Sequence, residues 1–173
     1  FIAELLGTMT MILLGDGVVA NVVLKKTKGF QGGWITITTA WALAVFAGVV
    51  IAGPYSGAHL NPAITIGFAI AEKFPWASVP SYVIAQMLGA AMGAFLVWIV
   101  YRDRFEVTDD PGAKLGVFCT APEIRHNVVN FGGELIATFV LMFSVFYITG
   151  AELIADVDTT TPIGLGSVGA IPV

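Results

Sequence analysis

Four apolar stretches, each about as long as a bilayer is thick, constrain this chain more than any other feature of its sequence. A helix needs about 20 mostly apolar residues to cross the hydrocarbon core of a membrane. The stretches are bounded by charge, glycine or proline and cover residues 1–24, 34–52, 79–101 and 128–148, and residues 163–173 resemble the start of a fifth. Because lipid offers the backbone no hydrogen bonds, stretches of this length predict an all-α membrane protein.

Composition supports the same conclusion and excludes other classes. The chain is 57% hydrophobic and 12% charged, with a mean hydropathy of +0.86, whereas soluble domains carry about 25% charged residues. Cys119 is the one cysteine, which excludes an intrachain disulfide, and His59 and His126 are too few and too far apart for a metal cluster. No cofactor or metal is therefore expected. No basic block is longer than residues 25–28, so nucleic acid is not an expected partner.

A short apolar segment between the second and third stretches is too short to span. It begins within the sequence SGAHLNPAIT of residues 56–65, in which Asn61 suits a helix N-cap and Pro62 the first helical position. Residues 61–71 therefore predict a helix of about three turns, half a bilayer long. Residues 53–60 before it are predicted to be extended. Because such backbone is tolerated at membrane depth only inside protein or beside water, this segment predicts a re-entrant loop beside a wet cavity.

Two further patterns concern connections and packing. The polar stretch 102–127 predicts a surface loop. Small residues recur at every fourth position on two of the stretches and predict close helix contacts; they are Ala40, Ala44 and Gly48, and Ala85, Gly89 and Gly93.

An internal repeat relates the first stretch to the fourth. Residues 3–8 read AELLGT and residues 133–138 read GELIAT, so Glu4 and Glu134 correspond at an offset of 130 positions. A carboxylate within a span usually faces a partner or a cavity. Three spans per copy would place the copies in opposite orientations, with the functional site near the midplane. We therefore predict one incomplete channel domain over residues 1–173: a first repeat (1–101), a connecting loop (102–127) and the start of a second repeat (128–173).

Together, SGAHLNPAIT, AELLGT, GELIAT and Gln86 within AQMLGA resemble the major intrinsic protein family of aquaporins and glycerol facilitators. The resemblance implies an inverted-repeat bundle of six transmembrane helices plus two re-entrant half-helices, which meet through two NPA motifs. Asn61, Pro62 and Ala63 match the first motif, and a second is expected near position 191. The family also implies a multi-pass protein of the plasma membrane, usually a homotetramer with one pore per protomer.

The glycerol facilitator branch is the more similar one. Trp41 lies twenty residues before Asn61, at a constriction position where orthodox water channels usually carry phenylalanine. An indole would give the carbon edge of a polyol a flat apolar wall. The long connection 102–127 also resembles this branch. The resemblance therefore implies a passive channel, not an enzyme, whose solutes are glycerol, other small neutral polyols and water.

The residues of the loop suggest how such a pore would work. An extended backbone can offer solutes the carbonyl oxygens of Gly57, Ala58, His59 and Leu60, replacing hydrogen bonds with water. Asn61 can donate its amide N–H to a solute oxygen, and the positive end of the half-helix points at the same place. That positive end would also raise the barrier to protons and cations, as described for aquaporin-type pores.

Four polar side chains are interpreted as supports. The ring of His59 is expected to pack behind the loop, and Glu4, Glu134 and Gln86 are expected to brace the two re-entrant loops, as in the resembled family. Two other functions stay open: a strict water channel, and an ion- or proton-coupled transporter in which the glutamates are the coupling groups.

Charge and family disagree about orientation. Seven of the eight basic residues lie in the connections after the first and third stretches, which the positive-inside rule would place in the cytoplasm. The resembled family places these connections outside the cell. We follow the family here, because basic residues in segments beyond this sequence also enter the count.

Overall fold

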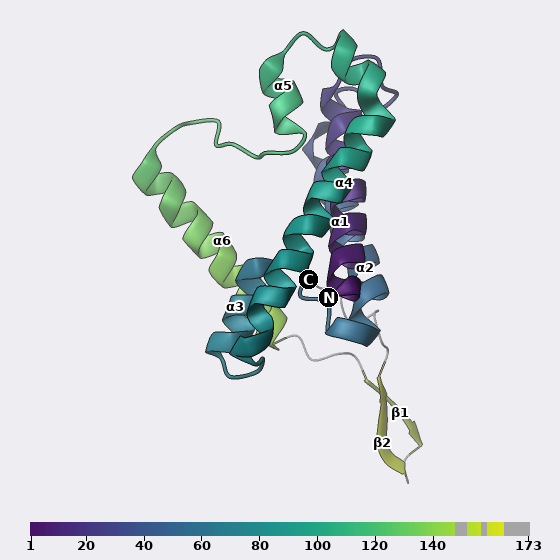
Figure 1. Ribbon diagram of the computed structural model, residues 1–173, viewed down its shortest axis with the longest axis vertical. Coiled ribbons are helices and arrows are strands. Elements are labelled where there is room, and N and C mark those ends of the chain that lie inside the picture. Colours follow the sequence, from purple (N-terminus) through teal and green to yellow (C-terminus); the bar gives the residue numbers. More distant parts are fainter. Residues whose placement is uncertain (148–151, 157–158, 165–173) are drawn as a thin grey trace. The chain divides into compact units, whose positions relative to one another are not determined.

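The computed structural model describes residues 1–147, 152–156 and 159–164. The chain forms two compact units, Phe1–Ile124 and Arg125–Val173, which are described separately (Figure 1). Four helices of the described residues are long and apolar enough to cross a membrane, which confirms the predicted class of helical membrane protein. They are α1 (Ile2–Val23), α2 (Gly33–Ser56), α4 (Val79–Val107, continuous with the short 3-10 turn Trp76–Ser78) and α6 (Asn127–Tyr147).

In the first unit, α1 packs against both α2 and α4 (Figure 1). The contacts are close because glycines let backbone meet backbone. A Cβ atom on Gly7 would lie 3.1 Å from the carbonyl oxygen of Gly48, and one on Gly93 would lie 2.6 Å from that of Met9. Gly89 approaches the backbone of α1 as closely. The small residues predicted from their spacing therefore serve contacts among helices of one unit.

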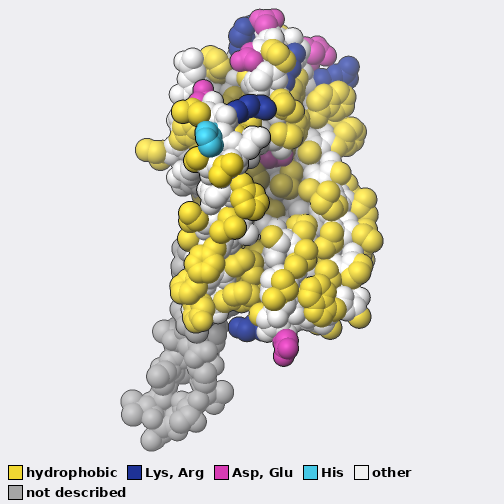
Figure 2. All heavy atoms as spheres, turned by 90° about the vertical axis from the view of Figure 1, so that its left-hand side faces the viewer, with side chains coloured by type: hydrophobic (Ala, Val, Ile, Leu, Met, Phe, Trp, Pro, Cys, Tyr) yellow, Lys and Arg dark blue, Asp and Glu magenta, His cyan; other side chains and the backbone are white. Residues whose placement is uncertain are grey.

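Exposed tryptophan and tyrosine side chains lie near both ends of the apolar parts of α2 and α4. Trp34 and Tyr55 are both exposed near the ends of α2, about 31 Å apart along the helix axis. Trp76 and Trp98 are exposed on the α4 side and lie about 33 Å apart by the same rise per residue. Both separations match a hydrocarbon core of about 30 Å flanked by aromatic residues. Hydrophobic side chains predominate on the face shown in Figure 2, as expected for an integral membrane protein.

Helix α2 continues further than its sequence predicts. We expected extended chain from residue 53, but α2 includes Pro54 and ends at Ser56. Pro54 has no N–H to donate to the carbonyl four residues earlier, and α2 ends two residues after it. Gly57 then ends the helix with φ 79°, and its N–H donates to the carbonyl of Gly53 at 3.1 Å. The non-helical segment is therefore residues 57–60, not 53–60, and the prediction of extended backbone was wrong there, because three of its four residues have positive φ.

The stretch 102–127 is also more ordered than predicted. Helix α4 continues through Arg102 to Val107, and a short helix α5 follows over Pro111–Gly116. The charged residues end the membrane span without ending the helix, because arginine and glutamate favour helices and Arg102 lies 3.5 Å from Glu106 one turn later. The prediction of an irregular loop was wrong for these parts of the segment.

Residues around α5 dock on the ends of α1 and α4. Leu24 and Val117 are buried together with Val97 in one apolar cluster. The rings of Phe105 and Phe118 stack with their centroids 5.6 Å apart. The connection that follows α4 is therefore packed onto the first unit as an extramembrane cap.

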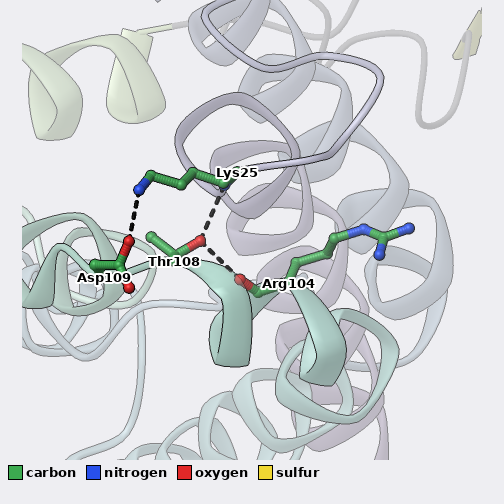
Figure 3. A network of polar contacts seen from close by, with 4 residues as sticks. All are labelled: Lys25, Arg104, Thr108 and Asp109. Atoms are coloured by element: carbon green, nitrogen blue, oxygen red, sulfur yellow. Dashed lines mark hydrogen bonds and ion pairs between the residues drawn. The ribbon is translucent and has the colours of Figure 1, made fainter.

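Polar contacts join the same two connections (Figure 3). The Lys25 ammonium donates to Asp109 at 2.8 Å, and the Lys25 backbone N–H donates to the Thr108 hydroxyl at 3.0 Å. That hydroxyl donates in turn to the carbonyl of Arg104 at 2.7 Å. Because Lys25 follows α1 and Asp109 follows α4, both connections lie on the same side of the membrane.

The ion pair gives a pH-dependent expectation. The hydrogen bond from Lys25, aided by its charge, holds the pKa of Asp109 below its ordinary value of 3.8. A lowered carboxyl pKa stabilises the fold at pH values above the ordinary one, and that stabilisation is lost as the pH falls through the lowered pKa. In Asp109→Asn, we therefore expect the backbone amide of Lys25 to exchange hydrogen faster than in the wild type at about pH 6, and equally fast once the pH lies below the lowered pKa of Asp109.

Mass-spectrometric hydrogen exchange at matched pH would measure this difference. Asp103→Asn removes an exposed carboxylate from the same helix end and serves as the control. Equal exchange in Asp109→Asn and the wild type at neutral pH would show that the pair does not hold the two connections together.

The second unit contains α6 and a two-stranded antiparallel hairpin, β1 (Glu152–Asp156) and β2 (Thr159–Gly164). In the hairpin, Leu153 pairs with Ile163. The hairpin was not predicted; its second strand begins with three threonines, whose branched side chains favour strands. The predicted start of a fifth span at residues 163–173 lies outside the described residues, apart from its first two positions, which end β2.

Candidate functional site

The re-entrant loop (residues 57–60) and the short helix after it form the most polar part of the span interior. Helix α3 (Pro62–Ile70) begins after Asn61, whose side-chain Oδ1 accepts a hydrogen bond from the Ala63 N–H at 2.8 Å. Pro62 occupies the first helical position and Ala63 the second, as their order predicts. With nine residues, α3 is about 14 Å long, roughly half of the hydrocarbon thickness.

Leu60 anchors the loop inside the span. It is 5% exposed and wedged between α1 and α2: a Cβ atom on Gly7 would lie 2.7 Å from Leu60 Cδ2, and one on Gly48 would lie 2.8 Å from Leu60 Cδ1. Gly48 is about 12 Å along α2 from the last residue of that helix. The loop therefore returns into the membrane, as the length of the short segment predicts.

The backbone of the loop is held in an uncommon conformation. Ala58 and Leu60 have φ values of 50° and 52°, in the left-handed region that residues with a side chain rarely adopt. Such a conformation persists only when surrounding contacts over-determine it. The hydrogen bonds to Glu4 supply those contacts.

Glu4 lies in the first turn of α1 and is fully buried. Its Oε1 accepts from the Ser56 hydroxyl at 2.6 Å and from the His59 N–H at 3.0 Å. Its Oε2 accepts from the Leu60 N–H and from Gln86 Nε2, both at 2.8 Å. Four donors thus converge on one carboxylate and join α1, α2, α4 and the loop.

A second layer of hydrogen bonds centres on Thr65 of α3. Its Oγ1 accepts from Gln86 Nε2 at 3.0 Å and donates to the backbone carbonyl of Asn61 at 3.1 Å. The same oxygen lies 3.1 Å from His59 Nδ1. Because the hydroxyl has a single proton, this third contact needs a proton on Nδ1. His59 is therefore the donor, and Thr65 ties the ring to the start of α3.

Aromatic rings enclose the imidazole of His59, which is 8% exposed. Phe68 stacks on it at 4.9 Å between centroids, Phe74 meets it edge-on at 4.7 Å, and Tyr82 lies 5.0 Å away. The Tyr82 hydroxyl donates to the carbonyl of Ser56 at 3.0 Å. The ring is thus packed as a support, which leaves the backbone of residue 59 to face elsewhere.

The hydrogen-bonding groups left over define what the site can bind. Among the residues that the structure describes, the carbonyl oxygens of residues 57–60 accept no hydrogen bond, and neither does the Asn61 side-chain amide donate one. Four acceptors in sequence and one donor next to them are therefore free within the span. Within the same described ranges, no cluster of His, Cys, Asp or Glu could hold a metal ion.

Trp41 lies on the face of α2 that packs against α1. It shares this face with Ile37, Ala44 and Gly48, spaced by three or four residues, all of which are buried. Gly48 contacts Leu60 of the loop, so Trp41 lies along the same face, about 10 Å from the loop by helical rise. Its indole rests on Gly15 of α1.

Glu134 belongs to the second unit, where it is exposed on α6. Sequence reasoning missed four residues of the site: Gly15, Ser56, Thr65 and Tyr82. Ser56 and Thr65 flank the predicted motif, so their nearness was visible, but no periodicity distinguishes their hydroxyls from surface ones. The contact of Gly15 with Trp41 joins two helices, and nothing in either helix alone indicates it.

Comparisons with known proteins agree with this architecture. The family model described as "Major intrinsic protein" matches residues 1–172. The chain is 54% identical over 156 residues to a protein named "Probable glycerol uptake facilitator protein" of Thermotoga maritima, covering 90% of this chain and 66% of that protein. It is 47% identical over 148 residues to the glycerol uptake facilitator protein of Bacillus subtilis, covering 86% of this chain and 54% of the relative.

A solved structure is also similar. The aquaglyceroporin from Plasmodium falciparum aligns with a TM-score of 0.59 and 39% identity, over 64% of this chain and 45% of that one. The chain thus spans between about half and two thirds of the length of the two curated relatives. The predicted resemblance to glycerol facilitators is confirmed by these matches. Its helices, its capped half-helix and its matches over nearly all residues establish that the chain belongs to the major intrinsic protein family.

Proposed function

We propose that this protein is a passive transmembrane channel for glycerol and other small neutral polyols, through which water also passes. The observation that carries the proposal is the set of unused groups inside the span: the free carbonyls of residues 57–60 beside the free amide of Asn61. A solute that leaves water must replace its hydrogen bonds, since an unmade one costs roughly 2–7 kcal/mol in an apolar medium. Hydroxyl groups can donate to these carbonyls in succession and accept from Asn61.

Exclusion of charge follows from the same geometry. Helix α3 begins at Asn61, so its N-terminal partial positive charge points at the place where a solute oxygen would be held. A proton or cation there would meet that field without compensating hydration. The fixed loop therefore selects neutral solutes that carry oxygen.

Preference for polyols over water rests on Trp41 and on the relatives. The indole presents a flat apolar surface about 10 Å from the loop along α2, suited to the carbon backbone of a polyol whose hydroxyls face the opposite wall. The relatives reported above are named as glycerol uptake facilitators. A strict water channel is the alternative within the family.

The complete channel needs a second half-site. We propose that the two units belong to one domain, that α6 begins an inverted copy of the first repeat, and that Glu134 braces a second re-entrant loop as Glu4 braces the first. We further propose a homotetramer in the plasma membrane, with the connections after α1 and α4 outside the cell. Those connections contact each other through Lys25 and Asp109, so both must lie on the same side of the membrane.

A coupled transporter is the less supported alternative. A coupling carboxylate must gain and release a proton or an ion during the cycle. The oxygens of Glu4 are already shared among four donors and have no exposed surface. This environment favours a brace that keeps its four hydrogen bonds over a group that must exchange a proton or an ion in each cycle.

Stopped-flow light scattering on proteoliposomes tests the proposal. We expect the intact protein to accelerate glycerol uptake well beyond that of empty liposomes, with a rate that does not change when a proton or sodium gradient is dissipated. Water flux without glycerol flux would favour the strict water channel instead. Uptake that collapses with the gradient would favour the coupled transporter.

A further inference from the structure

Gly15 of α1 is in direct contact with the indole of Trp41. A Cβ atom built on Gly15 would lie 2.6 Å from each of three ring atoms of Trp41, namely Cε2, Cζ2 and Cη2. Carbon atoms normally approach no closer than about 3.5 Å. Equal distances to three neighbouring atoms mean that the six-membered part of the indole lies over the position where a side chain would begin. Only glycine leaves room for the ring there.

The contact fixes one side of the ring. Trp41 is partly exposed, so one part of the indole rests on α1 while another remains open to a solute. The backbone of α1 is held in turn by its close packing on α2 and α4, at Gly7 and Gly93. The position of the open part of the ring is therefore set by how closely the indole approaches α1.

We propose that Gly15 is a positioning residue that determines solute specificity through Trp41. The inference rests on the proposed function, because it assumes that Trp41 borders the solute path. Without a side chain at position 15, the indole lies back against α1 and leaves the width that a polyol needs. A methyl group there would push the ring off α1 by about 1 Å, from the distance given above to normal contact.

The expected consequence is a change of selectivity. In Gly15→Ala, the displaced ring changes the constriction for glycerol more than for water, since water is the smaller solute. One extra methylene group in an apolar pocket alters discrimination by roughly 10- to 200-fold. We therefore expect the ratio of glycerol to water permeability to fall, by about 10-fold at the lower end of that range.

Gly17→Ala is the matched control. Gly17 lies two residues further along the same helix, and nothing lies within 4 Å of a Cβ atom built on it. Both variants replace a glycine of α1 with alanine and raise helix propensity equally. We expect Gly17→Ala to keep the wild-type permeability ratio, so a change confined to Gly15→Ala isolates the contact with the ring.

A double variant separates positioning from a general packing defect. Phenylalanine lacks the outer indole atoms that meet position 15, so Gly15→Ala in a Trp41→Phe background should have the permeability ratio of Trp41→Phe alone. Comparing the single and double variants also tests the contact if Gly15→Ala does not fold. In that case, recovery of folding in the double variant supports the contact. Failure of both to fold would overturn the inference, because the defect would then not depend on the indole.

Fluorescence provides a readout that does not depend on transport. With Trp34, Trp76, Trp98 and any further tryptophan of the intact protein replaced by phenylalanine, emission comes from Trp41, and we expect Gly15→Ala but not Gly17→Ala to shift its maximum. Wild-type liposomes without glycerol flux would overturn the proposed function and the specificity role with it. Glycerol flux in the wild type with an unchanged permeability ratio in a folded Gly15→Ala would overturn the inference alone.

Discussion

In Glu4→Ala, we expect the first unit to be strongly destabilised and glycerol flux to be lost. The substitution leaves the Ser56 hydroxyl, the N–H groups of His59 and Leu60 and the Gln86 amide without their acceptor. Each buried donor left without its acceptor costs about 1–3 kcal/mol. Because the loop has φ values that need external support, its conformation should be lost before the helices unfold.

Thermal unfolding in detergent and glycerol flux in proteoliposomes would measure the two effects. Glu4→Gln should be intermediate, because its amide keeps one acceptor oxygen and turns a donor toward the remaining N–H groups. Glu106→Ala removes an exposed glutamate from α4 and should change neither quantity. A Glu4→Ala protein with wild-type melting and flux would show that the carboxylate does not hold the loop.

The second large effect is expected for Asn61→Asp. An aspartate oxygen still accepts from the Ala63 N–H, so the cap of α3 and the fold should be kept. The amide donor is lost, and a negative charge is added where α3 directs its positive end. Losing one hydrogen bond to the solute costs about 1–3 kcal/mol, so we expect glycerol flux to fall roughly 5- to 100-fold. The added charge should also let cations enter the site.

Flux and cation leak in the same liposomes would test this expectation. Asn127→Asp adds the same charge at the exposed start of α6 and serves as the control. A folded Asn61→Asp protein with wild-type glycerol flux and no cation leak would remove Asn61 from the solute path, whatever the function of the rest of the loop.

Much of the fold could be predicted from local sequence. An apolar run of about 20 residues is stable in lipid as a helix, because its backbone hydrogen bonds are then made within the segment. The spans could therefore be located within a few residues. The errors concern the ends of α2 and α4, where the same local residue pattern is compatible with a helix that stops and with one that continues. Gly53-Pro54 was interpreted as the helix end, but α2 continues for two residues after the proline and is ended by Gly57. Arg102 was correctly interpreted as the end of the hydrophobic span but wrongly as the end of the helix. A charged side chain limits insertion into the membrane and does not prevent helix formation.

The site divides in the same way. The cap of α3 could be predicted, since Asn61 and Pro62 act on adjacent backbone. Glu4 could be singled out because a carboxylate in a span needs partners, but its four partners come from three other segments. Ser56, Thr65 and Tyr82 could not be assigned, since a hydroxyl acquires a role only from what lies opposite it.

By itself, the sequence determined that this protein lies in a membrane, where its spans are, and that a half-length helix begins at Asn61. Those properties depend on hydrophobicity and on backbone groups a few residues apart. Only the tertiary structure decided what Glu4 holds and where the Trp41 ring rests. The physical reason is distance along the chain: Glu4 and Gln86, like Gly15 and Trp41, meet only after separate helices pack, and no local pattern encodes the position of one helix against another.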